Sequence, residues 1–198
     1  MKNLSYIAAA ALLSTTAVAE TNIQEVLVSA SLIPIAATRS ANAITVIDGT
    51  QLKNRAALSV SDLLRDVPGL AVSRSGVQGS VTQIRARGAE ANHLLVLIDG
   101  VEASDPSQSD EVNWGTLSAD DIERIEVIRG PQSSMRGSDA MAGVVNIVTR
   151  SADQPFSAKA FTEAGSFSTQ RSGFSLGHKQ GDFDVRLGLS HVETDGDN

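Results

Sequence analysis

The polar and apolar positions around residue 130 predict a short helix and two strands that flank a polar turn. Residues 119–123 are expected to form the helix, capped by Ser118 and followed by the start of a strand. Gly130 and Pro131 interrupt the pattern, because glycine allows a positive φ and proline has no N–H to donate. The run 144–149 is continuous and rich in β-branched residues, which predicts a second, buried strand.

A strand and two helices are predicted further upstream. The apolar run 44–47 predicts a strand, and Thr50 is the expected cap of a short helix that begins at Gln51. Ser59 is the expected N-cap of a second helix, which Pro68 and Gly69 end. Its apolar residues recur at helical spacing and form one face, made of Val60, Leu63, Leu64 and Val67.

Three more segments complete the predicted domain. A strand begins at residues 70–72, and a turn rich in glycine and serine follows. Polar and apolar residues partly alternate over 80–87, as in a half-buried strand. The run 94–98 is the most apolar and is expected to be covered on both faces. Residues 38–152 are therefore predicted to form a mixed α/β (α+β) domain with a small mixed sheet and short helices.

After Ala152 apolar and polar residues alternate in three stretches, 156–165, 172–179 and 183–190. Outer-membrane barrel strands show this alternation over about ten residues, with one face towards lipid. A small soluble β-meander would show the same pattern. Three strands cannot close a barrel, whose smallest common form has about eight. We therefore expect 153–198 to be the first three antiparallel strands of a truncated transmembrane β-barrel, and the chain to be the N-terminal part of a larger protein.

The first nineteen residues have the pattern of a secretory signal peptide. Lys2 supplies a positive charge, a short apolar stretch follows, and Ala17 and Ala19 mark a small-residue cleavage site. The apolar stretch is too short to cross a hydrocarbon core of about 30 Å as a helix. The mature protein is expected to begin at Glu20 and to be exported, so that any membrane role falls to β-strands.

Composition and motifs exclude several kinds of chemistry. The chain has 198 residues, a formal net charge of -7 and no cysteine, which excludes disulfides and disfavours nucleic-acid binding. His93 and Asp99 have no G-x-S-x-G serine to complete a triad. The loop 137–143 lacks the Lys-Ser/Thr end of a phosphate site, and 195–198 lacks the glutamate of a calcium loop. An enzyme is therefore disfavoured, and no cofactor or metal is predicted.

Four stretches resemble the plug domain of TonB-dependent outer-membrane receptors. They are RIEVIRGP at 124–131, GSDAMAGVVNIVT at 137–149, HLLVLIDGV at 93–101 and D-L-L-x-x-V-P-G at 62–69. The resemblance covers most of residues 25–192 and is nearest to cobalamin (vitamin B12) receptors. It implies a plug domain over 38–152 in the cell outer membrane. It also implies an active transporter that imports cobalamin, with a ferric siderophore or heme as the alternative solute.

The resemblance also implies a TonB box and linker over residues 20–37. The box comprises Glu25, Val26, Leu27, Val28, Ser29 and Ala30. Read alone, this segment is one short strand that Pro34 stops. A strand-forming peptide of this kind can add to the open sheet edge of a partner through main-chain hydrogen bonds. The resemblance identifies that partner as TonB, the inner-membrane energy transducer.

Two further sets of residues follow from the resemblance. Apical loops at 81–83, 89–92 and 103–110 are expected to bind the solute, through Val81, Gln83, Glu90, Asn92, Ala103 and Ser104. Glu90 stands where cobalamin receptors tend to carry a neutral amide, and Arg136 where an aromatic is usual. Arg87 and Arg129 are expected to seat the plug by pairing with carboxylates of the barrel wall. Without the resemblance, they would be surface ion pairs of little value.

Another class of protein stays open at this stage. In a soluble periplasmic binding module, the last three strands would form a small sheet on the domain instead of part of a barrel. The two interpretations differ in what covers the apolar face of those strands, lipid in one and solvent or protein in the other.

Overall fold

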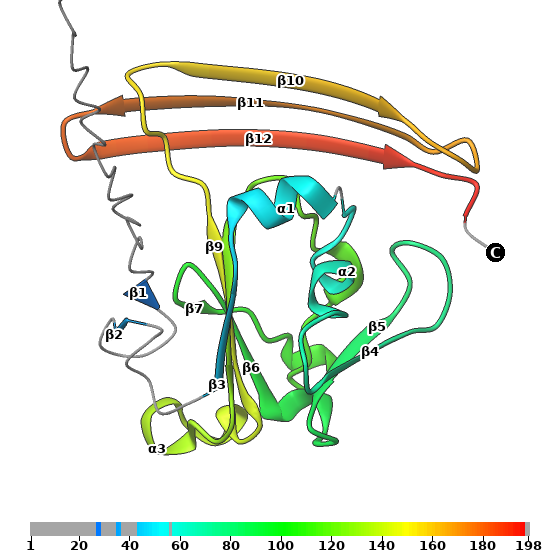
Figure 1. Cartoon of the computed structure of the whole chain (residues 1–198), viewed down its shortest axis with the longest axis vertical. Helices are drawn as coiled ribbons and strands as arrows, with labels where there is room; N and C mark the ends of the chain where they lie inside the picture. Colours follow the sequence, from blue (N-terminus) through cyan, green and yellow to red (C-terminus); the bar gives the residue numbers. More distant parts are fainter. Residues whose placement is uncertain (1–26, 29–34, 37–42, 56, 197–198) are drawn as a thin grey trace, which may run out of the picture.

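The computed structural model describes residues 43–55 and 57–196, together with two short strands nearer the N-terminus, β1 (Leu27–Val28) and β2 (Ile35–Ala36). These two strands pair with each other in an antiparallel arrangement. The remainder comprises a mixed domain, from β3 to β9, and a sheet of three strands that follows it. Figure 1 shows the strand sheet lying across one end of the mixed domain.

A five-stranded sheet forms the centre of the mixed domain. Its order is β3-β8-β9-β6-β7, and the β9–β6 pair is parallel whereas the others are antiparallel. The prediction of a small mixed sheet is therefore confirmed. The strands are β3 (Ala43–Ile47), β8 (Ile122–Arg129), β9 (Gly143–Thr149), β6 (Leu94–Ile98) and β7 (Val101–Glu102).

A hairpin and short helices surround this sheet. The hairpin pairs β4 with β5, and its turn projects away from the sheet (Figure 1). Its strands and the α-helices are β4 (Leu70–Arg74), β5 (Thr82–Ala86), α1 (Gly49–Arg55), α2 (Val60–Leu64) and α3 (Ser133–Arg136). The 3-10 helices are η2 (Ala91–His93), η3 (Pro106–Gln108), η4 (Trp114–Thr116) and η5 (Ser138–Ala140).

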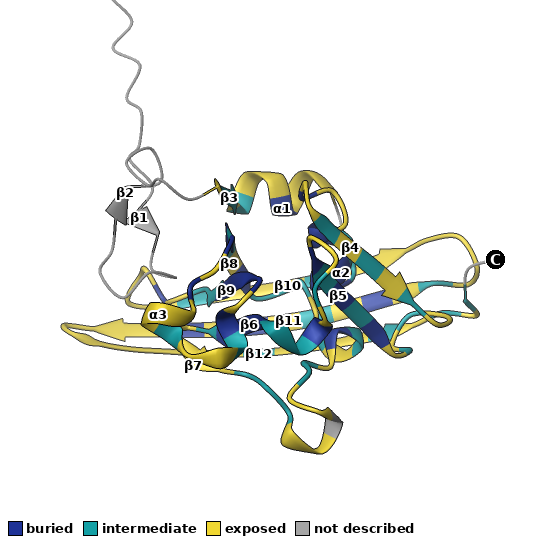
Figure 2. Ribbon diagram, turned by 90° about the horizontal axis from the view of Figure 1, so that it is seen from below, coloured by how far each residue is buried: buried dark blue, intermediate teal, exposed yellow. Residues whose placement is uncertain are grey.

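The apolar core lies on both faces of the central sheet. The larger cluster packs Val60, Leu63 and Leu64 of α2 against alternate residues of β8 and β9, such as Ile125 and Val145. A smaller cluster on the other face contains Leu95, Leu97, Ile128, Ala140 and Val144. Figure 2 shows the central strands as buried and the surrounding turns as exposed. The prediction that residues 94–98 are covered on both faces is thus confirmed.

The predicted helix over residues 119–123 is wrong. The Ser118 Oγ donates to the Asp120 carboxylate at 2.7 Å, and the Asp120 N–H donates back to that Oγ at 3.3 Å, which closes a turn. The Ala119 N–H donates to the Leu58 carbonyl, and Ile122 already belongs to β8. These backbone groups are engaged by a neighbouring segment, so they are not free to form helical bonds.

Two predicted helix boundaries also need correction. Asp48, and not Thr50, caps α1, because its carboxylate accepts from the N–H groups of Thr50 and Gln51 at 2.8 and 2.9 Å. Ser59 caps α2 as predicted, since its Oγ accepts from the Asp62 N–H. That helix ends at Leu64, earlier than its apolar spacing indicated.

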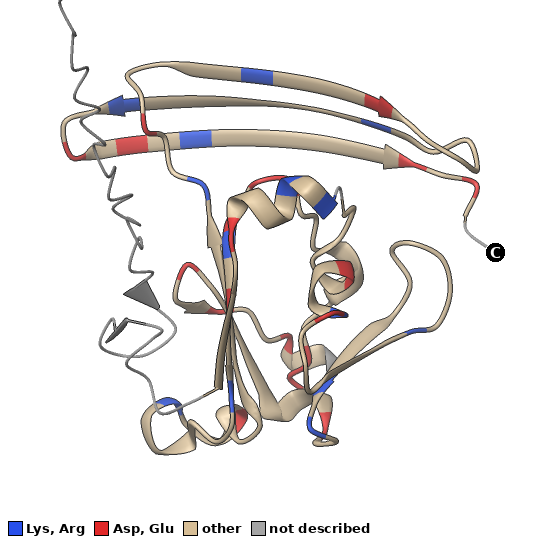
Figure 3. Ribbon diagram, viewed as in Figure 1, with Lys and Arg blue, Asp and Glu red and all other residues tan. Residues whose placement is uncertain are grey.

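The strand sheet contains β10 (Ser157–Ala164), β11 (Gln170–Gln180) and β12 (Phe183–Glu193) in antiparallel order. Three antiparallel strands are therefore present where the alternation predicted them. By register, the charged residues of these strands share the face of Arg171 and Arg186, which pair with the mixed domain, and Glu193 at the end of β12 is the exception. Figure 3 marks where the charged residues fall along the strands. Among the described residues, no helix is long and apolar enough to cross a membrane.

Candidate solute-binding loops and their supports

A side-chain hydrogen bond links the predicted loop 81–83 to Glu111, the residue that follows the predicted loop 103–110. The Gln83 amide on β5 donates to both carboxylate oxygens of Glu111, at 2.9 and 3.3 Å. The Gln83 oxygen in turn accepts from the Arg85 guanidinium at 2.9 Å. Since Glu111 closes the loop that begins at Ala103, β5 and this loop are held side by side. Val81, just before β5, is 66% exposed.

The loop from Ala103 to Asp110 has a defined conformation. The Asp105 N–H donates to the Glu111 carbonyl, and the Asp110 N–H to the Asp105 carbonyl, which closes the loop at its base. Ser109 and Asp110 both have positive φ, 59° and 60°. Such backbone strain in residues other than glycine is concentrated at ligand-binding and active sites. Ser104 donates to Glu102 at 2.7 Å on the exposed side of the loop.

The third predicted loop approaches β5 from another direction. η2 packs beside β5 and buries Ala91, whereas Glu90 is exposed and Asn92 half-buried. The His93 carbonyl accepts from the Ala142 N–H at 2.8 Å, which fixes the end of this loop on the central sheet. Strand β5 thus overlaps the predicted loop 81–83, contacts η2 of the loop 89–92, and bonds to Glu111 directly after the loop 103–110.

A glycine lets the hairpin turn pack closely on η4. A β-carbon at Gly115 would lie 2.5 Å from the Ser80 carbonyl oxygen and 2.9 Å from that of Gly79. Any other residue would push the two segments apart, because side-chain carbons do not approach backbone oxygens so closely. The turn before Val81 is thus held against the residues that follow the 103–110 loop.

Arg74 ties the hairpin to helix α2. Its Nη2 lies 2.7 Å from the Asp62 carboxylate, 3.2 Å from the Ser59 Oγ and 3.1 Å from the Ser61 Oγ. The Arg74 side chain is 13% exposed, and both serines are buried. A buried guanidinium with several partners fixes orientation more strongly than a surface pair does. Sequence reasoning missed this residue, because its partners lie twelve to fifteen positions away.

The two arginines predicted to seat the domain lie together beside Gly69. The Arg129 guanidinium donates to the Pro68 carbonyl at 2.7 Å, to the Ala43 carbonyl at 3.3 Å and to the Thr45 hydroxyl at 2.9 Å. Arg87 has a positive φ of 51°, and its N–H donates to the Gly69 carbonyl. This end of the central sheet is opposite the strand sheet (Figure 1). Their pairing with wall carboxylates stays a prediction.

The described charge contacts between the mixed domain and the strand sheet use other residues. Asp120 pairs with Arg171 of β11, and Asp121 pairs with Arg186 of β12 at 3.0 Å. Sequence reasoning missed all four residues. Positions 171 and 186 share one face of the strands by parity, but parity alone does not tell which face meets the domain.

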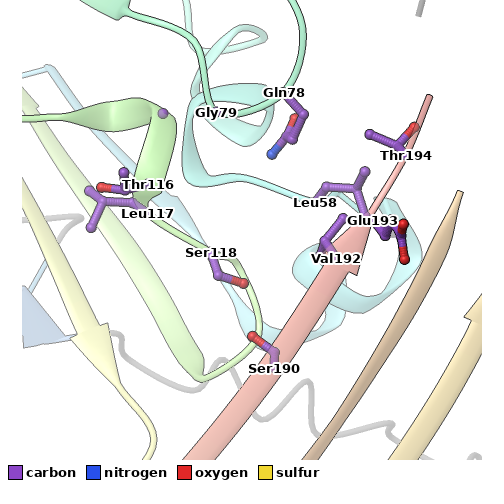
Figure 4. A pocket seen from close by; sticks show the side chains of 11 residues that line it. Leu58, Gln78, Gly79, Thr116, Leu117, Ser118, Ser190, Val192, Glu193 and Thr194 are labelled. Carbon is purple, nitrogen blue, oxygen red and sulfur yellow. The ribbon is translucent and has the colours of Figure 1, made fainter. Parts of the chain in front are cut away.

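A cavity of about 540 Å³ separates the two parts nearer the hairpin. Figure 4 shows Gln78 and Leu58 of the mixed domain, together with Ser190 and Val192 of β12 and Thr194, which follows that strand. The interface is therefore closed at the two aspartates and open towards the hairpin turn. Among the described residues, no cluster of His, Cys, Asp and Glu has the composition of a metal site.

The predicted TonB box lies mostly outside the described residues. Leu27 and Val28 form β1, and the structure does not describe Glu25, Val26, Ser29 and Ala30. Where it is described, this segment pairs with β2 and forms a sheet separate from the central one. The assignment as a TonB box stays a prediction.

The sequence matches the family described as TonB-dependent Receptor Plug Domain over residues 36–144. That range contains the central sheet up to the start of β9, the hairpin and the three predicted loops. The chain belongs to this family, and the mixed domain is a plug domain.

The chain is similar to receptors and transporters that are much longer than it is. It is 36% identical to "Vitamin B12 transporter BtuB" of Vibrio vulnificus (strain CMCP6) over 131 residues, 66% of this chain and 21% of the relative. The siderophore receptor PirA from Acinetobacter baumannii is 26% identical with a TM-score of 0.61, covering 80% of this chain and 25% of the receptor. The chain thus spans about a fifth to a quarter of these relatives.

A more distant structure shows the fold alone. The pyoverdine outer membrane receptor FpvA from Pseudomonas aeruginosa PAO1 superimposes with a TM-score of 0.71 at 16% identity. The match covers 85% of this chain and 24% of the receptor. A plug followed by strands is therefore shared with proteins of quite different sequence.

Proposed function

We propose that this chain is the N-terminal part of a TonB-dependent outer-membrane transporter that binds and imports cobalamin. The observation that carries the proposal is the 36% identity to the vitamin B12 transporter of Vibrio vulnificus, which extends over 66% of this chain. The outer membrane holds no ion gradient or nucleotide pool, so tight capture outside requires release by energy from the inner membrane. A plug linked to TonB through residues 25–30 would supply that release.

The outer face of the strand sheet supports an outer-membrane location. By register, Ala158, Leu176 and Leu187 lie in one row and Ala160, Phe174 and Leu189 in the next. Of these, the four large side chains are between 43% and 59% exposed. An apolar, exposed face opposite a polar one is expected for strands that face lipid on one side. We therefore assign β10–β12 as the first strands of a transmembrane barrel.

The arrangement of loops supports an orientation of the molecule. The turn between β11 and β12 is short, whereas residues 165–169 form a longer loop between β10 and β11. Outer-membrane barrels have short turns at the periplasmic side and longer loops outside. The Asp195 N–H donates to the Phe167 carbonyl, and a β-carbon at Gly196 would lie 2.9 Å from the Val77 side chain. The hairpin turn thus shares the end with the longer loop, which we assign as extracellular.

In this orientation the three apical loops meet the incoming solute. We assign solute contacts to Val81, Gln83, Glu90, Asn92, Ala103 and Ser104, which the hairpin gathers at one surface. Arg87 and Arg129, at the other end of the central sheet, are proposed to pair with carboxylates of wall strands beyond those described. Export would use the signal peptide of residues 1–19.

A ferric siderophore is the second candidate solute. PirA is described as a siderophore receptor and FpvA as a pyoverdine receptor, and PirA shares 26% identity with this chain. The exposed Glu90 carboxylate stands in the predicted solute surface and would repel an anionic ferric chelate more than the neutral cobalamin. This charge disfavours an anionic chelate, while Glu90 also departs from the neutral amide that cobalamin receptors tend to carry at this position.

A chimera tests the proposed solute. Residues 20–193 would replace the corresponding segment of the Vibrio vulnificus transporter, and the purified protein would be titrated with cobalamin, a ferric catecholate, a ferric hydroxamate and heme. The same barrel without its plug measures what the barrel loops contribute alone. We expect cobalamin to bind more tightly to the chimera than to the empty barrel. Equal affinity in both, or tighter binding of a ferric chelate, would overturn the assignment.

A further inference from the structure

The turn before β8 presents two adjacent carboxylates to two neighbouring strands. Asp120 pairs with Arg171 on β11, and their side chains are 11% and 10% exposed. The Asp121 Oδ1 accepts from Nε and Nη2 of Arg186 on β12, at 3.2 and 3.0 Å. Each strand thus contributes one arginine to one aspartate of the plug.

On the plug side of this contact, Asp120 and Asp121 also bond to residues of the plug itself. The second oxygen of Asp120 accepts from the Ser118 Oγ at 2.7 Å. The Asp121 carbonyl accepts from the Arg150 N–H at 2.8 Å, which fixes the turn on the end of β9. The plug's own residues therefore hold the Asp120 carboxylate and the Asp121 backbone in place, so less freedom is lost on pairing.

On the strand side, other residues of the sheet position the two arginines, and a glycine leaves space for Asp121. The Arg171 guanidinium lies 5.1 Å from the centre of the Phe161 ring and donates to Glu163 at 3.1 Å. Arg186 donates to the Ser175 Oγ at 2.8 Å. A β-carbon at Gly188 would overlap the Asp121 carboxylate, so the lack of a side chain at this position makes the space that Asp121 occupies.

Apolar packing around the two pairs is incomplete. A hollow of about 180 Å³ lies between Ile98, Leu117 and Ile147 of the plug and Gly188 of β12. A second cavity, of about 540 Å³, lies between the plug and the end of β12. Missing contacts across such gaps contribute little cohesion, which leaves the ion pairs as the main attachment at this interface.

We propose that Asp120 and Asp121 are the positioning residues that dock the plug on the first strands. Their partners on those strands are Arg171 and Arg186. Gly188 leaves the space that the Asp121 carboxylate occupies. The assignment of β10–β12 as barrel strands belongs to the proposed function, and the role of docking in transport rests on it. The docking contact itself is a property of this chain. A dock made of charges can separate and re-form in water more readily than an apolar seam, because its separated partners are well solvated.

Spin-label distances test the dock directly. The chain has no cysteine, so Val101→Cys on the plug and Leu187→Cys on the outer face of β12 give one labelled pair in detergent micelles. Pulsed electron–electron double resonance then reports one narrow distance distribution between the two spin labels when the plug is docked. Asp120→Asn with Asp121→Asn should lower the docked-to-undocked ratio about tenfold and broaden the distribution. Lys159→Gln is the matched control, since Lys159 lies on the same strand face without an ion pair among the described residues.

A steric variant and a fold check complete the test. Gly188→Ala should also undock the plug, whereas Gly165→Ala, where the nearest side-chain carbon would be 3.6 Å away, should not. Emission from buried Trp114 shows whether the plug remains folded in each variant. A docked distance that persists in both Asp120→Asn/Asp121→Asn and Gly188→Ala would overturn the proposal. Solute does not enter the measurement, so its result is independent of whether cobalamin is the cargo.

Discussion

Gly143 lies against the backbone of Ile128, so closely that a β-carbon at position 143 would stand 2.5 Å from the Ile128 carbonyl oxygen. Gly143 is the first residue of β9 and pairs with Arg129 on one side and Leu94 on the other. Its φ of 156° is one that other residues rarely adopt. Strand β9 therefore enters the middle of the sheet at a point that only glycine fits without displacement.

Gly143→Ala should reduce the free energy of unfolding by about 3 kcal/mol or more, since it adds a clash with backbone to an unfavourable φ. Urea unfolding followed by the emission of Trp114 measures this change. Gly137→Ala is the control, because Gly137 also has a positive φ but has no atom within 4 Å of the added carbon. It should cost about 1 kcal/mol. Equal losses for both would contradict the steric explanation.

Replacing Arg74 with methionine should destabilise the plug by about 2 kcal/mol, because Ser59, Ser61 and Asp62 lose a shared partner in a largely buried place. Arg55→Met is the comparison, since the Arg55–Asp66 pair is much more exposed and should contribute less than about 1 kcal/mol. Both values come from the same urea titrations. If the two variants unfold alike, Arg74 does not hold the hairpin on α2.

A buried polar pair crosses the central sheet between β8 and β9. The Asn146 amide donates to the Glu126 carboxylate at 3.3 Å, and both side chains are almost fully buried. Asn146→Ala should cost about 2 kcal/mol, because the carboxylate loses a donor that water cannot replace. Asn113→Ala, at an exposed position, serves as the reference and should change stability little. A similar small loss at Asn146 would show that the pair is not stabilising.

Gln83 links the predicted solute loop 81–83 to the base of the predicted solute loop 103–110, so its loss should weaken cobalamin binding by the chimera. Gln83→Ala is expected to raise the dissociation constant about tenfold, because Glu111 no longer holds the 103–110 loop beside β5. Isothermal titration calorimetry gives the dissociation constant. Gln51→Ala, an exposed glutamine of α1, should leave it unchanged. Unaltered binding in both variants would place the solute elsewhere.

Local patterns were enough to predict most of the strands. Residues 94–98 and 144–149 are continuous apolar runs, and burial on both faces requires that composition. The helix predicted over residues 119–123 is wrong because the Leu58 carbonyl and the Ser118 hydroxyl bond to its backbone N–H groups, and these partners come from outside that segment. The two-residue strand β7 offers too short a pattern to be recognised.

The candidate site was predictable as loops but not as contacts. Gln83 was named, yet its partner Glu111 lies one residue beyond the predicted loop and 28 positions from Gln83. The predicted partners of Arg129 are carboxylates of the barrel wall, whereas its described partners include carbonyls of the plug itself, 61 and 86 positions away. Such pairings depend on tertiary position, which residue spacing does not encode.

Energy-coupled uptake tests the central claim most directly. Cells that lack their own cobalamin transporter would express the chimera and be given labelled cobalamin, with and without TonB. Val28→Pro removes a main-chain donor from the proposed TonB box while leaving the solute loops intact. We expect uptake with TonB, and loss of uptake but not of surface binding without TonB or with Val28→Pro. Cobalamin uptake that is indifferent to both changes, or no cobalamin uptake by a folded and surface-exposed chimera, would contradict the account.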